Sequence, residues 1–295
     1  MTLTRLSGFL LSLLLGAALL CAGAAAGPLQ DRLAERAGKR HAGEAAGTGA
    51  VRIEVGGVAR SYLLHVPKAE GPLPVVMSLH GFRSDAGQQQ TLSGLSRLAD
   101  AEGFIAVYPQ GLDAKWRFAR PGADADFILA VIEDVALRTA VDRDRIYVNG
   151  ISNGAQMAWR MACDHPQVFA AVGYVAGGYP KVCNAGQVPT ILFHGTDDRL
   201  LPYDGRPPFI AVRDFARGAA TGAECRLAET GEIVFATRDV TGERWACNQA
   251  APVVLYTVQG GGHSWPGSAA MPAQITTQDI DASQLMWAFF KGFSR

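Results

Sequence analysis

A serine with a glycine two positions to either side is the most informative feature of the sequence. Ser152 lies between Gly150 and Gly154. Residues 146–148 before it are β-branched and aromatic, as in a short buried strand, and residues 153–162 after it are mostly strong helix formers. A serine on so tight a strand-to-helix turn needs small neighbours, and the turn lifts its hydroxyl clear of the sheet edge. The pentapeptide alone could be a chance match in a surface turn, so a catalytic role for Ser152 requires a base, an acid and oxyanion donors elsewhere in the chain.

A serine hydroxyl becomes a nucleophile when a base removes its proton and a third group orients that base. His263 is the best candidate for the base, because it follows the last expected core strand in the glycine-rich loop 260–267. Such a loop can fold back over the carboxyl edge of the sheet. The other histidines fit simpler roles in a leader, a hairpin, a helix end or strand-end turns: His41, His65, His165, His80 and His194.

The acid that orients the base should follow a strand and precede the histidine in the chain. Asp197 and Asp198 are adjacent candidates. In this kind of loop the acid lies four residues after a histidine and four before a proline, and His194 and Pro202 select Asp198. Either aspartate could instead cap a local turn, as this residue type often does.

A tetrahedral intermediate also needs two N–H donors for its oxyanion. The backbone N–H of Asn153, directly after the serine, is one candidate. The other is the N–H of Phe82, which follows the turn at Gly81 after an expected strand. The alternative for Phe82 is an ordinary exit from a strand into a loop.

Alternating strands and helices must position these residues. The sequence predicts an edge hairpin over 51–66, a second hairpin between Cys225 and Cys247, and core strands at 75–79, 104–108, 146–148, 170–175, 190–193 and 253–258. Helical patterns lie after 79 and after 152, and over 124–139, 210–219 and 285–293. This order predicts an α/β fold with a mainly parallel central sheet and helices on both faces. Ligands of such sheets bind beyond the carboxyl ends of the strands, where the candidate residues fall.

The start of the chain differs from the rest. Residues 1–26 have the pattern of a secretory signal peptide, and 27–50 resemble a mobile leader. The apolar run 9–20 is short for a membrane anchor, and Cys21 lacks the small residue expected before a lipid-modified cysteine. We therefore expect export to the periplasm or the extracellular medium. Residues 51–295 are expected to form one catalytic domain without a large lid.

Composition narrows the classes of partner. The chain has 295 residues, of which 48% are hydrophobic, enough for a sizeable core. Its 27 basic and 27 acidic residues balance, so nothing indicates nucleic acid or an anionic membrane as partner. Cys-x-x-Cys and His-x-x-x-His spacings do not occur, so neither a metal nor another cofactor is expected. We expect a monomer that meets only its substrate.

Four cysteines remain once Cys21 leaves with the signal peptide. In an oxidising compartment an even number suggests two disulfides, which allow three connectivities. We favour the sequential pairs Cys163–Cys183 and Cys225–Cys247. Free buried thiols are the alternative.

These motifs resemble a known family, the secreted poly(3-hydroxybutyrate) depolymerases and feruloyl or acetylxylan esterases of the α/β-hydrolase superfamily. The similar stretches are 79–81, 108–111, 141–154, 194–198 and 261–267. The resemblance extends from about Val51 to the last residue. It places the family's nucleophile on Ser152, its acid on Asp198 and its base on His263. It also implies the same two cysteine pairs.

The resemblance has departures. Many depolymerase-like members have cysteine where this chain has Phe82, and we expect no separate polymer-binding domain after the catalytic unit. Trp116 and Trp265 could form aromatic walls for an acyl chain or a sugar, or could simply pack. The expected function is a secreted serine carboxylesterase acting on hydroxyalkanoate (oligo)esters. The alternatives are a feruloyl or acetylxylan esterase, an acyltransferase, and a non-catalytic polymer binder.

Overall fold

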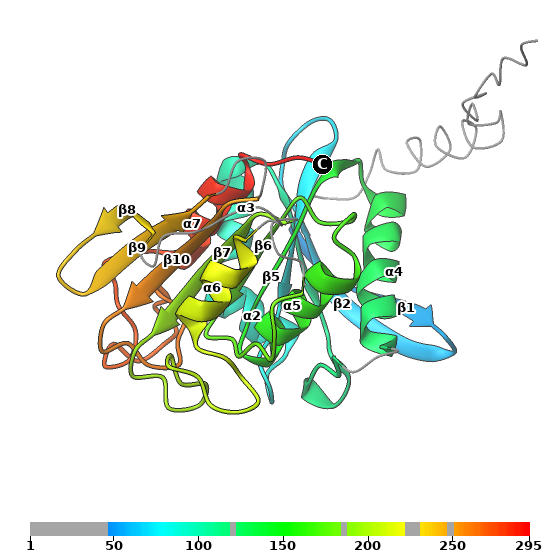
Figure 1. Ribbon diagram of the computed structural model, residues 1–295. Coiled ribbons are helices and arrows are strands. Elements are labelled where there is room, and N and C mark those ends of the chain that lie inside the picture. Colours follow the sequence, from blue (N-terminus) through cyan, green and yellow to red (C-terminus); the bar gives the residue numbers. More distant parts are fainter. Residues whose placement is uncertain (1–46, 119–121, 184–187, 222–230, 247–250) are drawn as a thin grey trace, which may run out of the picture.

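The computed structural model describes residues 47–118, 122–183, 188–221, 231–246 and 251–295. Within these ranges a 10-stranded sheet has the order β1-β2-β4-β3-β5-β6-β7-β10-β9-β8 (Figure 1). The strands are β1 Gly47–Val55, β2 Val58–Val66, β3 Leu73–Leu79, β4 Ile105–Pro109, β5 Val141–Ile151, β6 Ala171–Val175, β7 Thr190–Gly195, β8 Glu232–Ala236, β9 Val240–Trp245 and β10 Val253–Val258.

The centre of the sheet is parallel and its two edges are antiparallel. Strands β4, β3, β5, β6, β7 and β10 pair in parallel, whereas the β1–β2 and β8–β9 hairpins form the edges. Every residue of β3, β4, β6, β7 and β10 is buried. That burial explains their nearly continuous apolar sequences, because strands covered on both faces have no solvent side. The predicted fold class is confirmed.

Helices cover both faces of the sheet. They are α2 Ala86–Ser93, α3 Leu95–Glu102, α4 Ala123–Arg138, α5 Asn153–Asp164, α6 Val212–Ala219 and α7 Ala282–Phe290, with a short 3₁₀ turn, η1, at Leu112–Ala114. One buried cluster joins α4, α5 and α6 to the sheet, and a second joins α2, α3 and α7. Figure 1 shows α4, α5 and α6 together on one side. The parallel strands are therefore held between two helical layers.

Some element bounds differ from those predicted. Strand β1 begins at Gly47 rather than at residue 51, because it pairs with β2 over its full length, from Gly47 opposite Val66. Strand β5 begins at Val141, ahead of the apolar run at 146–148, and its first half includes exposed charged residues. Helix α7 ends at Phe290, so Phe293 lies beyond it but still packs against the same cluster.

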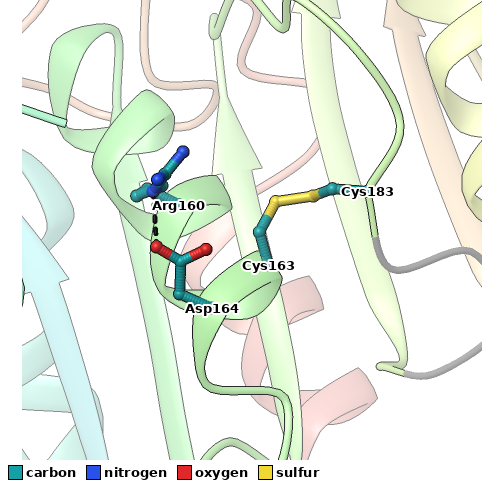
Figure 2. Close-up of a disulfide and its surroundings, with 4 residues drawn as sticks. All are labelled: Arg160, Cys163, Asp164 and Cys183. Atoms are coloured by element: carbon teal, nitrogen blue, oxygen red, sulfur yellow. Dashed lines mark ion pairs between the residues drawn. A yellow bond between two sulfur atoms is a disulfide. The ribbon is translucent and has the colours of Figure 1, made fainter. Parts of the chain in front are cut away.

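A disulfide joins the helix after Ser152 to the loop after β6. Cys163 in α5 is bonded to Cys183, with Cα atoms 5.5 Å apart and 20 positions between them in sequence (Figure 2). Arg160 and Asp164 form an ion pair one turn apart on the same helix. The predicted disulfide between Cys163 and Cys183 is confirmed. Cys225 and Cys247, like residues 1–26 and the leader up to residue 46, lie outside the described residues.

Candidate active site

Ser152 occupies the turn between β5 and α5, as its sequence pattern predicts. Its backbone has φ 56° and ψ −120°, a conformation that costs free energy for any residue other than glycine. The turn is held on both sides, because Ser152 N donates to Val175 O at 2.9 Å and Gln156 N donates to Ser152 O at 3.0 Å. The strained backbone is thus fixed by the neighbouring strand β6 and by the first turn of α5.

The two glycines beside the serine are required by backbone packing. A Cβ atom on Gly150 would overlap the backbone of Gly154, and one on Gly154 would overlap the carbonyl groups of Leu79 and His80. The start of α5 therefore lies directly against the end of β3. This close approach brings Ser152 next to the loop that follows β3.

Asp198 lies just after β7, and its carboxylate is completely buried. Its Oδ1 accepts hydrogen bonds from Leu200 N and Leu201 N, both at 2.9 Å. Its Oδ2 accepts from His263 Nδ1 at 2.7 Å. Burial alone would raise the pKa of Asp198, but hydrogen bonds from His194 and His263 outweigh it and hold that pKa well below its ordinary value of 3.8. Asp198 is therefore a carboxylate at neutral pH, whereas its neighbour Asp197 is exposed.

His263 lies in the loop after β10, which is tied to the end of β7. Thr196 N donates to Val258 O and Asp197 N donates to Gly261 O, each at 2.9 Å. Since a carboxylate only accepts, the bond to Asp198 places a hydrogen on Nδ1 of His263. In the neutral ring Nε2 then keeps its lone pair. His263 is therefore oriented as a base.

The structure joins the acid to the histidine, but it does not join the histidine to the serine. Among the described residues, the Ser152 hydroxyl makes no hydrogen bond. Hydrogen bonds between catalytic groups are often long without substrate and tighten in the complex. The three residues lie at the same end of the parallel sheet, because Ser152, Asp198 and His263 follow the parallel strands β5, β7 and β10.

The two candidate oxyanion donors lie on the segments that meet at Gly154. The amide of Phe82 donates no hydrogen bond to another described residue, and Phe82 is 56% exposed. The amide of Asn153 belongs to the first turn of α5, whose N–H groups have no acceptor inside the helix. Both amides are therefore available to a ligand.

The two tryptophans considered as aromatic walls are both buried. Trp116 is 3% exposed and its Nε1 donates to His80 O at 2.9 Å. Trp265 is 1% exposed and its Nε1 donates to Ser283 Oγ at 3.0 Å. These contacts favour the packing alternative for both rings.

Two contacts at this site were not predicted from the sequence. His194 Nε2 lies 2.7 Å from Leu201 O and 3.3 Å from Asp198 Oδ2, so a second, buried histidine faces the carboxylate. The Asn153 side chain binds the backbone of Trp116. The only sequence signals were the four-residue spacing of His194 and Asp198, and the asparagine directly after the serine.

A cavity of about 560 Å³ adjoins these loops. It is lined by Ser84 and Asp85 after the Phe82 loop, by residues of α2, and by Ala270 and Met271 beyond His263.

The described residues contain no cluster of three or more side chains suited to a metal ion, and none of their helices is long and apolar enough to cross a membrane.

Known proteins share this sequence and fold. Residues 60–185 match the family model described as Esterase PHB depolymerase. The chain is 32% identical over 276 residues to "Putative esterase NocK" of Nocardia uniformis subsp. tsuyamanensis, covering 80% of each chain. It is 28% identical over 242 residues to "Probable feruloyl esterase C" of Aspergillus niger, covering 78% of this chain and 83% of that one.

A solved structure has a similar fold. The acetyl xylan esterase from Aspergillus awamori has a TM-score of 0.54 at 14% identity, covering 73% of this chain and 94% of that chain. The sequence match with NocK spans most of both proteins. The chain belongs to the PHB depolymerase-type esterase family of the α/β-hydrolases.

Proposed function

We propose that the protein hydrolyses carboxylic esters by nucleophilic catalysis, with Ser152 as nucleophile, His263 as base and Asp198 as acid. The observation that carries the proposal is the 2.7 Å hydrogen bond between His263 Nδ1 and the buried Asp198 carboxylate. It leaves Nε2 of His263 as the nitrogen that accepts the serine proton. The carboxylate stabilises the imidazolium that then forms.

The reaction proceeds in two halves. Ser152 Oγ attacks the carbonyl carbon while its proton passes to His263 Nε2, and the carbonyl electrons move onto the oxygen. The N–H groups of Phe82 and Asn153 hold that oxyanion. Collapse of the intermediate expels the alcohol, which takes the proton from His263. Water then attacks the acyl-enzyme by the same route, releasing the carboxylic acid and restoring Ser152.

Ser152→Ala tests the mechanism directly. With p-nitrophenyl acetate, kcat should fall roughly 10⁴-fold or more, because loss of the nucleophile leaves only the remaining binding groups. A fluorophosphonate probe should label the wild type and not the variant. Full activity of Ser152→Ala on this ester would refute the proposal.

For the substrate class we propose hydroxyalkanoate (oligo)esters, which the matching family model favours. The second candidate is a feruloyl or acetylxylan ester, favoured by the likeness to the Aspergillus niger relative, whose name is a feruloyl esterase. Hydroxybutyrate trimer, methyl ferulate and acetylated xylan should be compared by kcat/KM on one enzyme preparation. A higher value for methyl ferulate or xylan than for the trimer would replace the first candidate by the second.

We also propose that the enzyme is exported and works outside the cytoplasm. The Cys163–Cys183 disulfide supports this, because disulfides persist in oxidising compartments. Mass spectrometry of the mature protein from a producing cell should find a first residue near 25–27, after removal of residues 1–24 or 1–26. An uncleaved chain confined to the cytoplasm would contradict export.

A further inference from the structure

The two amides proposed to hold the oxyanion belong to segments far apart in the chain. Phe82 follows β3, and Asn153 begins α5. Oxyanion stabilisation depends on both donors reaching one oxygen at about 2.7–3.1 Å, so their separation must be held closely. Residues 111–116, a third segment, contact both sides.

The side chain of Asn153 binds this third segment through two hydrogen bonds. Its Oδ1 accepts from Trp116 N at 2.7 Å, and its Nδ2 donates to Trp116 O at 3.2 Å. An asparagine amide can satisfy both backbone groups of one residue because it has an acceptor and donors side by side. The residue that follows the nucleophile is thereby fixed to Trp116.

Trp116 in turn binds the loop that carries Phe82. Its indole N–H donates to His80 O at 2.9 Å, and its ring lies 5.0 Å from the His80 ring. The same segment holds His80 through Gly111 N, which donates to Nε2 at 2.9 Å. On the other side of Phe82, Arg83 N donates to Ala114 O at 2.7 Å. Phe82 is thus held from both sides by residues 111–116.

We propose that Asn153 and Trp116, here called the oxyanion bridge, are positioning residues that set the spacing between the Phe82 and Asn153 amides. The role rests on the ester hydrolysis proposed above. The side chains of the two bridge residues set the spacing, and only the backbone N–H groups of Phe82 and Asn153 touch the oxyanion. Its effect therefore falls on the tetrahedral state more than on the planar ester, so it changes kcat rather than KM.

Two variants break the bridge in different places. Trp116→Phe removes the indole N–H and keeps an aromatic ring, whereas Asn153→Ala removes the side-chain amide and keeps the backbone N–H. In each, kcat for p-nitrophenyl acetate, per site titrated with fluorophosphonate, should fall about 10- to 100-fold, less than the loss of a whole donor. KM should change less than about twofold. The affinity for phenylboronic acid, whose adduct with Ser152 is tetrahedral, should fall by a similar factor.

Trp287→Phe is the matched control. It also removes one indole hydrogen bond of a buried tryptophan, here to the partly exposed Glu102 Oε2 at 2.7 Å, but on α7, where the ring packs against Phe104. It should keep wild-type kcat and boronate affinity.

Three results would overturn the bridge. They are wild-type kcat in both bridge variants, an equal loss in Trp287→Phe, and a loss that disappears once activity is divided by the number of labelled sites. A wild type that neither hydrolyses the ester nor reacts with the probe would instead overturn the proposed function, and the role of the bridge with it.

Discussion

At the scale of single residues, the environment of Asp198 defines the site. Four hydrogen-bond donors face its two oxygens: His263 and His194 from side chains, and the amides of Leu200 and Leu201. The carbonyl of Leu201 accepts from His194 Nε2, so that nitrogen carries a hydrogen, and it also lies 3.3 Å from Asp198 Oδ2. A buried carboxylate with this many donors remains ionised, which is what a base awaiting a proton requires.

Replacing Asp198 by asparagine should remove most of the activity. Asp198→Asn keeps the size of the side chain but can stabilise the wrong tautomer of His263, and kcat should fall by about 10⁴, as for equivalent changes in other triads. Initial rates with p-nitrophenyl acetate measure it. Asp197→Asn makes the same chemical change at the exposed neighbouring residue and should leave kcat within about twofold. Equal losses in both variants would contradict the assignment of the acid.

The lowered pKa of Asp198 also predicts how stability depends on pH. A carboxyl whose pKa is lower in the folded than in the unfolded state contributes stability that is complete above the unfolded value, here 3.8. That contribution is lost as the pH falls through the lower folded value. The free energy of unfolding of the wild type minus that of Asp198→Asn should therefore be constant from pH 5 to 7, and smaller at pH 3. Urea titrations at each pH measure it, and a difference that grows toward pH 3 would contradict the sign.

Residue types and spacing were enough to single out Asp198 and His263, whose side chains are in contact in the structure. The spacing from His194 and Pro202 selected Asp198, and the structure places that carboxylate, not Asp197, against His263. The contacts of Asn153 and His194 could not be predicted in the same way. Each depends on a backbone group of a loop, at Trp116 and Leu201, whose conformation has no periodic signal in the sequence.

At the scale of elements, β7 and the loop after β10 form one unit around Gly195. A Cβ atom on Gly195 would overlap the carbonyl oxygens of Gly261 and Gly262, so the loop that carries His263 lies directly on the end of β7. Backbone hydrogen bonds from Thr196 and Asp197 complete the contact. The distance between the acid and the base is therefore set by backbone packing rather than by the two side chains alone.

Gly195→Ala should push the base loop away from the acid. The added methyl group needs a backbone shift, which costs about 1–3 kcal/mol of unfolding free energy, and kcat should fall with it. Urea unfolding and ester hydrolysis measure the two effects. Gly49→Ala in β1 is the control, because a Cβ there meets no atom within 4 Å. If both variants behave alike, the packing at Gly195 does not hold the loop.

The elements that could be predicted were those whose sequences have a clear pattern of buried, apolar residues. Strands such as β3 and β10 are continuous hydrophobic runs, and their bounds agree with the prediction to within two residues. The first residues of β1 and β5 are largely exposed, and β5 there is charged. Hydrogen bonding to a neighbouring strand extends β1 and β5 beyond their apolar residues, and no apolar pattern in the sequence predicts that pairing.

At the scale of the whole molecule, the disulfide connects the helix after Ser152 to the connection between β6 and β7. Cys163 lies near the end of α5, the helix that follows Ser152, and Cys183 lies in the connection between β6 and β7. Both cysteines pack against the buried cluster that joins α4, α5 and α6 to the sheet. The cross-link restrains the unfolded chain across one crossover of the sheet.

The double variant Cys163→Ala, Cys183→Ala should be less stable by about 3 kcal/mol, the loop entropy expected for a closure of this length. Its kcat at 25 °C should stay within about twofold, because neither cysteine touches the triad. Urea unfolding without reductant measures the first effect and ester hydrolysis the second. An unchanged unfolding midpoint would show that the cross-link does not restrain the unfolded chain.

The order of the strands has a consequence for the chain as it leaves the ribosome. The proposed nucleophile, acid and base follow β5, β7 and β10, and β10 pairs with β7 in the interior of the sheet. A nascent chain that has not yet exposed residue 263 lacks both the base and the strand that positions it. Ribosome-bound chains that end before residue 263 should therefore be catalytically silent, and hydrolysis should begin only once β10 and the loop after it can fold against β7.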